Sequence, residues 1–141
     1  MIILDTDSLS LLDRERLLES SMLRENLRRF SPDDIFTTII TFKEQMCGWL
    51  SIIARSKNSE QQIYVYGKLH RFLESYRNTQ VLDYDEKAAE ILKDFKMQKI
   101  RVGTMDLKIA AIAASRSAIL VSRNLSDFLQ IPNLTVEDWA K

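Results

Sequence analysis

The chain has few of the residues that stabilise small secreted or zinc-binding domains. Its 141 residues include one cysteine, Cys47, and one histidine, His70. A single cysteine excludes an internal disulfide and fits a reducing compartment, so we expect a cytoplasmic protein. Two such residues also fall short of the Cys and His set of a structural zinc site. A metal site in this chain would have to use oxygen ligands.

The sequence also lacks a net charge and long apolar runs. Twenty Lys and Arg residues balance twenty Asp and Glu residues, so the broad basic surface of a general nucleic-acid-binding protein is excluded. No stretch approaches the roughly 20 apolar residues that a membrane helix needs. Asp5 interrupts the first apolar run well before the length of a secretory signal. We therefore expect no membrane association.

Glycine and proline are scarce, which limits the loops. The chain has three glycines and two prolines, whereas hydrophobic residues make up 45% of it. A chain of this length and composition is long enough to bury a sizeable core. We expect a single domain, residues 1–141, with short connections.

Short apolar stretches alternate with helical patterns along the chain. The patterns predict strands at 1–5, 35–40, 79–84, 117–122 and 134–139, and helices at 8–29 (broken near Asp13), 42–57, 60–77, 86–98 and 104–116. This alternation predicts an α/β fold in which helices cover both faces of a parallel sheet. Ligands of such sheets bind beyond the carboxyl ends of the strands, where the strand order reverses.

Acidic residues follow several of these strands. Asp5 and Asp7 come after the first strand, Glu44 follows "FTTII", Asp106 opens an alanine-rich helix and Asp127 follows "AILV". Carboxylates at one sheet edge repel one another, and Mg²⁺ or Mn²⁺, which prefers oxygen ligands, relieves that repulsion. The sequence therefore predicts an acidic metal site at the carboxyl ends of the strands.

The acids in the first part of the chain also have local explanations. Asp5 could simply end a strand, and Asp7 followed by Ser8 is typical of a helix N-cap. Thr41 and Glu44 have the spacing of a capping box, in which the glutamate accepts a hydrogen bond from the backbone of the cap.

The later acids have local explanations of the same kind. Thr104 could cap the alanine-rich helix, with Asp106 as a first-turn acid that the helix dipole favours. Asn124 could cap a short helix that carries Asp127. Each explanation is reasonable alone, but their coincidence at strand ends favours a shared site.

Four segments occur in an order and spacing that belong together: "IILDTD", "TTIITFKE", "RVGTMDLKIAAIA" and "ILVSRNLSDFLQIPNLTVEDW". Together they resemble the PIN-domain ribonucleases of the VapC toxin type, over nearly the whole chain. The resemblance implies a PIN-like parallel β-sheet flanked by helices and a pocket for Mg²⁺ or Mn²⁺. It implies that the catalytic and metal-binding carboxylates are Asp5, Glu44, Asp106 and Asp127.

The resemblance also implies a function and partners. The protein would be a metal-dependent endoribonuclease that cleaves RNA phosphodiester bonds, the toxin of a toxin–antitoxin pair, a homodimer and the target of a small antitoxin. Thr104 and Asn124 would orient the carboxylates from outside the ligand set. Asp7 stands where the family usually has asparagine, which adds a charge beside Asp5.

Four apolar residues with helical spacing predict either core or partner contacts. They are Met46, Trp49, Ile52 and Ile53. They exceed what a surface helix of a small monomer needs, so they permit the homodimer that the resemblance implies.

Two alternative functions remain open. "IILDTDS" also resembles the first motif of haloacid-dehalogenase-type phosphatases, in which an aspartate is the nucleophile and a second one acts as acid and base. That chemistry needs a later lysine and a further acidic pair, which "GTMD" does not supply. The other alternative is a catalytically silent PIN-fold interaction module, against which the intact acids argue.

Overall fold

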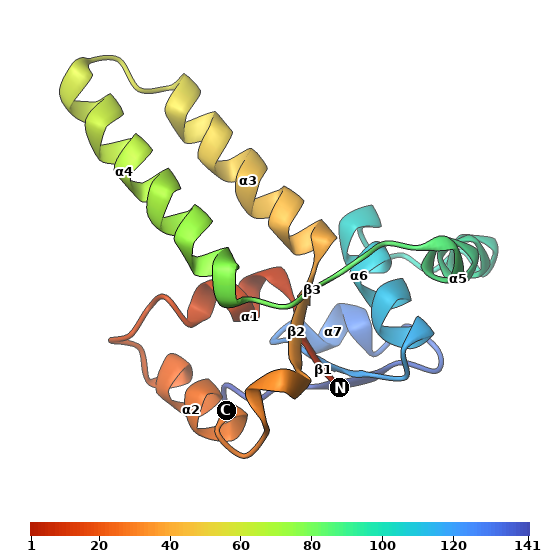
Figure 1. The fold of residues 1–141 in the computed structure, drawn as a ribbon. Coiled ribbons are helices and arrows are strands. Elements are labelled where there is room, and N and C mark those ends of the chain that lie inside the picture. The colour runs from red at the N-terminus through yellow and green to blue at the C-terminus, as the bar shows by residue number, and fades with distance from the viewer.

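A five-stranded parallel sheet forms the centre of the molecule (Figure 1); the structure is a computed structural model that describes residues 1–141. The strands are β1 (Ile2–Leu4), β2 (Ile35–Thr38), β3 (Val81–Leu82), β4 (Ile119–Val121) and β5 (Thr135–Glu137). Their order is β3-β2-β1-β4-β5, and every neighbouring pair is parallel. The chain moves outward from β1 to β3 and then returns to the other side of β1. The strand order therefore reverses between β1 and β4.

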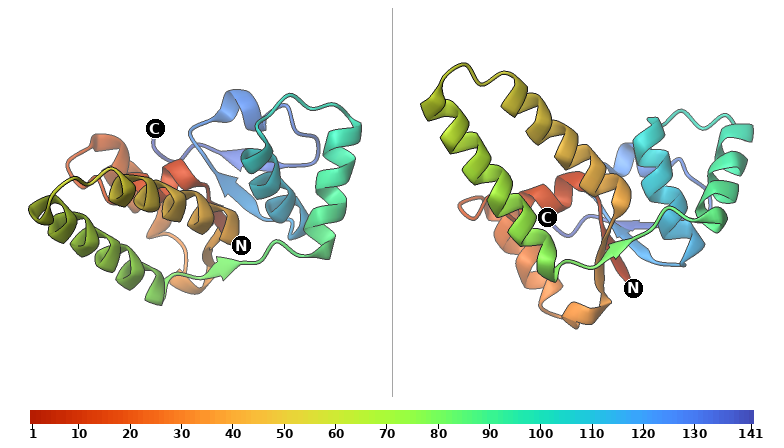
Figure 2. Two further views of the ribbon diagram at one scale, coloured as in Figure 1. Left: turned by 90° about the horizontal axis from the view of Figure 1, so that it is seen from above. Right: turned by 45° about the horizontal axis from the view of Figure 1, so that its top comes forward.

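Helices connect the strands and cover both faces of the sheet, which confirms the predicted α/β class (Figure 2). They are α1 (Thr6–Leu11), α2 (Leu18–Leu27), α3 (Ile39–Ala54), α4 (Ser59–Ser75), α5 (Glu86–Met97), α6 (Thr104–Ser115) and α7 (Leu125–Phe128), with 3-10 turns at Pro32–Asp34 and Tyr76–Asn78. The predicted break near Asp13 is confirmed, because this residue lies between α1 and α2. No helix is both long enough and apolar enough to cross a membrane.

Alternation along the central strands divides the core into two parts. Ile3 of β1 belongs to the larger cluster, which α5 and α6 cover. Ile2 and Leu4 belong to the smaller cluster, which α1, α2 and the C-terminal Trp139 cover. Successive side chains of a strand point to opposite faces, so this three-residue strand contributes to both parts. With layers on both faces, the carboxyl ends of the strands are held in fixed positions.

Helices α3 and α4 form a hairpin that extends away from the sheet (Figures 1 and 2). Aromatic side chains hold its base together: the ring centroids of Phe42 and Phe72 lie 5.6 Å apart, and the ring of Tyr76 lies 5.0 Å from each. Aromatic pairs at such distances stabilise a structure beyond their buried area. Beyond this base, large apolar side chains of the hairpin are exposed, among them Leu50, Ile63, Tyr64, Tyr66 and Leu73.

The start of α3 differs from the prediction. The predicted strand at 35–40 ends at Thr38, and the hydroxyl of Thr38 accepts the N-capping hydrogen bond from the backbone of Thr41 at 3.2 Å. The predicted capping box of Thr41 and Glu44 is therefore wrong, since both lie inside the helix. Two β-branched isoleucines favoured a longer strand, but the Thr38 cap and the burial of Ile40 start the helix there.

Candidate active site

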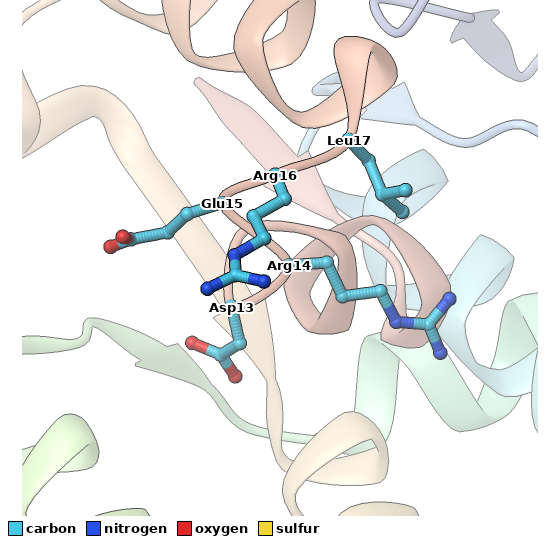
Figure 3. A pocket seen from close by; sticks show the side chains of 5 residues that line it. All are labelled: Asp13, Arg14, Glu15, Arg16 and Leu17. Carbon is cyan, nitrogen blue, oxygen red and sulfur yellow. The ribbon is translucent and has the colours of Figure 1, made fainter.

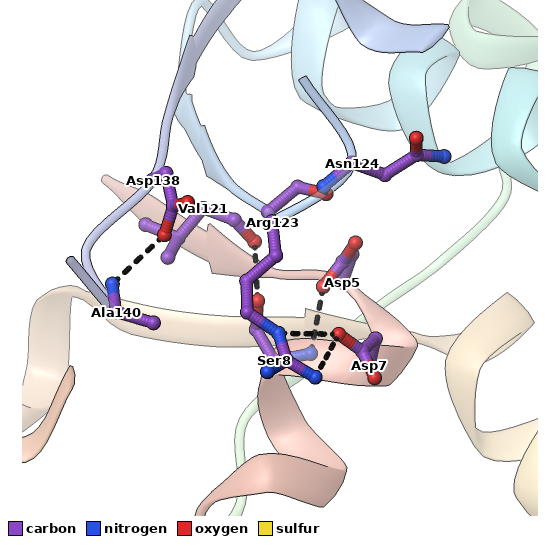
Figure 4. A network of polar contacts seen from close by, with 9 residues as sticks. Asp5, Asp7, Ser8, Val121, Arg123, Asn124, Asp138 and Ala140 are labelled. Carbon is purple, nitrogen blue, oxygen red and sulfur yellow. Dashed lines mark hydrogen bonds and ion pairs between the residues drawn. The ribbon is translucent and has the colours of Figure 1, made fainter. Parts of the chain in front are cut away.

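Asp5 lies directly beyond β1 and is only 5% exposed. Its Oδ1 accepts a hydrogen bond from the backbone N–H of Ser8 at 2.8 Å, which makes Asp5 the N-cap of α1 (Figure 4). The prediction that Asp7 caps this helix is therefore wrong. The helix begins at Thr6, so Asp7 already lies within its first turn. A carboxylate that caps a helix is fixed in position by the backbone.

Burial raises the pKa of Asp5 above the usual range of an aspartate, and the nearby charge of Asp7 raises it further. Hydrogen bonds from the Ser122 hydroxyl and the Ser8 backbone lower this pKa, but burial has the larger effect. A buried carboxylate whose charge is only partly compensated favours the approach of a cation.

Glu44 lies on α3 and is tied to α1. The hydroxyl of Thr6 lies 2.8 Å from Oε1 of Glu44, to which it donates, and 3.1 Å from the hydroxyl of Thr41. Thr6 is the first residue of α1, next to Asp5. The hydroxyl therefore holds Glu44 close to the end of β1.

Asp106 lies in the first turn of α6, near the other three predicted acids. Burial raises its pKa, and the negative charges of Glu44, Asp5 and Asp127 raise it further. Charges affect a pKa in this way only over short distances. Each of the three acids therefore lies near Asp106, although all four come from separate segments of the chain.

The N-cap of α6 is not the residue that the sequence suggested. Gly103 occupies this position and Thr104 is the first residue of the helix, so the prediction that Thr104 caps it is wrong. Gly103 has no side chain with which to cap. Asp106 therefore lies among the free N–H groups of the first turn, where the helix dipole favours a negative charge.

Asp127 is held by a neighbour in its own turn. The side-chain amide of Asn124 donates to Oδ2 of Asp127 at 3.0 Å. Asn124 is the N-cap of α7 but makes no capping hydrogen bond with its side chain. Its amide therefore orients the Asp127 carboxylate.

Arg123 is the residue of this edge that sequence reasoning missed. Its Nε and Nη2 both lie 2.8 Å from Oδ2 of Asp7, across 116 positions of sequence (Figure 4). The additional charge of Asp7 was a usable signal, since an extra carboxylate beside Asp5 requires a nearby cation. The motif "LVSRN" contains that cation directly after β4.

The donor set suits a hard divalent cation, since it consists of carboxylates. No three His, Cys, Asp or Glu side chains are placed so that they could hold one ion together. Mg²⁺ usually binds through one or two carboxylates, keeps several waters and takes further oxygens from a substrate phosphate. The arrangement around Asp106 fits this kind of site better than a closed protein cage.

Two of the molecule's hollows bear on the search for a site. One, of about 500 Å³, is formed by the connection between α1 and α2 and is lined by Asp13, Arg14, Glu15, Arg16 and Leu17 (Figure 3). The other is a groove of about 720 Å³ between α1 and the α3–α4 hairpin, with Leu9, Trp49, Ile52 and Phe72 among its apolar lining residues. None of the four acids lines either hollow, so neither is part of the acidic site.

Comparison with known proteins identifies the family. No protein-family model matches the chain. Ribonuclease VapC1 of Haemophilus influenzae (strain R2866) is 31% identical over 140 residues, which are 98% of this chain and 97% of that protein. The chain belongs to the VapC family of ribonucleases.

Two further VapC relatives match over shorter regions. Ribonuclease VapC2 of Rickettsia felis is 31% identical over 93 residues, 63% of this chain and 65% of that protein. The tRNA(fMet)-specific endonuclease VapC of Salmonella typhimurium is 39% identical over 64 residues, 43% of this chain and 48% of that protein. In both of these alignments the chain spans less than two thirds of the relative's length.

Solved structures agree with the family assignment. VapBC-1 from nontypeable Haemophilus influenzae has a TM-score of 0.72 and 27% identity, and the match covers 100% of both chains. FitAcB from Neisseria gonorrhoeae has a TM-score of 0.74 at 22% identity over 98% of this chain and 97% of that chain, which supports the fold alone. The resemblance to VapC toxins and the PIN-like fold are thereby confirmed, and the phosphatase alternative is set aside.

Proposed function

We propose that this VapC protein is a Mg²⁺- or Mn²⁺-dependent endoribonuclease and the toxin of a toxin–antitoxin pair. The observation that carries the proposal is that three carboxylates, those of Asp5, Glu44 and Asp127, lie near enough to Asp106 to raise its pKa, at the edge where the strand order reverses. The relatives, two of them ribonucleases and one a tRNA-specific endonuclease, support RNA as the substrate.

Asp5 and Asp106 are the proposed principal ligands, because both are partly or fully buried and both have a raised pKa. Glu44 and Asp127 are proposed to reach the ion through water or to orient the attacking water, since no three side chains are placed to hold one ion together. When bound, the ion supplies an activated water and compensates charge on the scissile phosphate. The carboxylates contribute by holding their oxygens toward one region from four different segments.

Hydrogen-bond donors fix three of the four carboxylates. Their pairs are the Ser8 backbone N–H with Asp5, Thr6 with Glu44 and Asn124 with Asp127. Hydrogen bonds of this kind orient the carboxylates and restrict the side-chain conformations that they can adopt. Asp106 has no such donor and is held by its place in the first turn of α6, so its side chain is the freest to adjust to a bound cation.

The α3–α4 hairpin and its groove are the proposed partner surfaces. Related solved complexes are described as VapBC assemblies, and one from Klebsiella pneumoniae is described as a toxin–antitoxin complex. In this chain, Ile63 is 75% exposed and Tyr66 53% exposed, which is unusual for side chains that gain by burial. We assign the groove beside Trp49 and Phe72 to a small antitoxin and the exposed hairpin residues to a homodimer.

The proposed activity is tested by incubating purified protein with transfer RNAs and with a small phosphomonoester. We expect discrete RNA fragments with Mg²⁺ or Mn²⁺, none in excess EDTA, and no release of phosphate from the monoester. Full cleavage in EDTA would overturn the metal dependence. Intact RNA under all conditions, from folded protein freed of any antitoxin, would favour the silent interaction module.

A further inference from the structure

Two consecutive residues that follow β4 each pair with a different acid of the sheet edge. The pairs are Arg123 with Asp7 and Asn124 with Asp127. The second pair orients a proposed metal ligand. The first pair joins a cation to the one acid of the edge that the proposed mechanism does not use.

The geometry of Arg123 leaves much of its guanidinium free. Its two contacts at 2.8 Å both go to a single oxygen, Oδ2 of Asp7. A guanidinium has five N–H donors, so after these two, three have no partner within the chain. The side chains of Arg123 and Asp7 are 33% and 54% exposed, and the pair lies beside Asp5 (Figure 4), so solvent and substrate can reach the free donors at this side of the acidic site.

The chemistry of the substrate explains the need for a cation at this position. An RNA phosphate that approaches four carboxylates is repelled until positive charge offsets them. The rigid fork of a guanidinium matches phosphate oxygens and holds them with charge-assisted hydrogen bonds. Asp7 fixes the fork at the edge and leaves its other donors available.

We propose that Arg123 binds a phosphate of the RNA backbone at the mouth of the site, with Asp7 as the positioning residue that holds the guanidinium there. This inference rests on the proposed endoribonuclease function. It differs from a purely structural role, in which Arg123 would only neutralise Asp7 and join α1 to the segment after β4.

Steady-state kinetics separate binding from chemistry. A phosphate contact that is present before and during the reaction contributes uniform binding, so Arg123→Gln should raise KM about 10-fold with little change in kcat. Arg116→Gln is the matched control, because Arg116 is also 33% exposed and also pairs with an aspartate, Asp85, but lies at the opposite end of α6 from Asp106. The control should keep the parent's KM.

The salt dependence of RNA binding measures whether Arg123 contacts a phosphate. Each phosphate contact to single-stranded RNA contributes about 0.7 to the slope of log Kd against log salt concentration. Fluorescence anisotropy with a short labelled single-stranded RNA, in EDTA and in the Asp106→Asn background, measures this slope without cleavage. Arg123→Gln should lower the slope by about 0.7, and Arg123→Lys, which retains the charge, should restore it.

A double variant distinguishes the contact from simple neutralisation. Arg123→Gln leaves Asp7 as an unpaired charge, and Asp7→Asn removes that charge. If Arg123 contacts phosphate, the double variant keeps the lowered slope. A return to the parent's KM and slope in the double variant, or unchanged values in Arg123→Gln, would overturn the inference. Failure of the parent to cleave RNA would instead overturn the proposed function, since the slope is measured independently of cleavage.

Discussion

The acidic sheet edge and the α3–α4 hairpin are exposed in opposite ways. At the edge, the carboxylate of Asp5 is buried and those of Glu44, Asp106 and Asp127 are partly buried, and no buried side-chain nitrogen or oxygen in the structure lacks a hydrogen-bond partner. On the hairpin, apolar groups face water: Ile63 is 75% exposed and Tyr64 66% exposed. Each arrangement costs free energy in an isolated protein, because buried charges and exposed apolar surface are both unfavourable.

The difference indicates what each region binds. Buried carboxylates of raised pKa gain when a cation approaches, whereas exposed isoleucine and tyrosine gain when another apolar surface covers them. The edge is built from the ends of strands, which hold side chains in fixed positions, as a catalytic site requires. The hairpin extends from the body and suits association. Substitutions in one region should therefore leave the function of the other unchanged.

The strongest test of this separation is Asp106→Asn. Removing a charge that holds the reaction centre should lower RNA cleavage by at least about 10²-fold. Self-association through the hairpin should not change. Asp94→Asn, at an exposed position of α5, is the control and should cleave as the parent does. Equal cleavage by Asp106→Asn and the parent would remove Asp106 from the site.

The converse test places charge on the hairpin. The double substitution Ile63→Asp and Tyr66→Asp should weaken the proposed homodimer by about 30-fold, the scale of losing an interface hot spot. Metal-dependent RNA cleavage by the double variant shows whether the acidic edge is affected, and we expect the parent's rate. Gln62→Asp on the same exposed helix is the control. Sedimentation that finds the parent monomeric at high concentration would contradict the homodimer.

A smaller effect separates the two roles of Asp5. Asp5→Ala removes the N-cap of α1 and should lower the free energy of unfolding by about 1 kcal/mol. Asp5→Asn retains a capping oxygen and removes a buried charge, so it should be at least as stable as the parent while losing cleavage. Urea unfolding in EDTA measures both variants. Equal destabilisation by the two would mean that the charge itself stabilises the fold.

The smallest effect is the dependence of stability on pH. Burial and neighbouring carboxylates raise the pKa of Asp106 in the folded state above the usual range of an aspartate. The folded protein thus binds this proton more tightly than the unfolded chain, so the charged form destabilises the fold at neutral pH and protonation relieves this. In EDTA, Asp106→Asn should exceed the parent in stability at pH 7, and the difference should fall to zero below the unfolded pKa. Urea unfolding at several pH values follows it, and a variant less stable at pH 7 would contradict the repulsion.

The sequence predicted which acids lie at the sheet edge better than it predicted where the neighbouring helices begin. Alternating apolar stretches indicate parallel strands, and the carboxyl ends of parallel strands meet at one edge, so Asp5, Asp106 and Asp127 could be grouped from their positions in the sequence alone. The caps at Thr38 and Gly103 were missed because a cap depends on the residue at which an element ends. Sequence patterns locate the end of a helix or strand only to within a few residues.

Arg123 was missed for a different reason. Its contact with Asp7 spans 116 positions and exists because β1 and β4 are neighbours in the sheet. Local periodicity carries no information about such a pairing. The groove and the exposed hairpin also depend on how α1 packs beside α3, which the positions of Trp49 and Ile52 in the sequence suggested only as core or partner contact.

The central claim, that the strand-end acids form one metal site, is tested most directly by the effect of Mg²⁺ on stability. At 100 times its dissociation constant, Mg²⁺ should raise the free energy of unfolding of the parent by about 2.7 kcal/mol, if one ion binds only the folded state. Asp106→Asn should gain much less in the same thermal melts. An equal gain in the two proteins, or no gain in either, would contradict a metal site around Asp106.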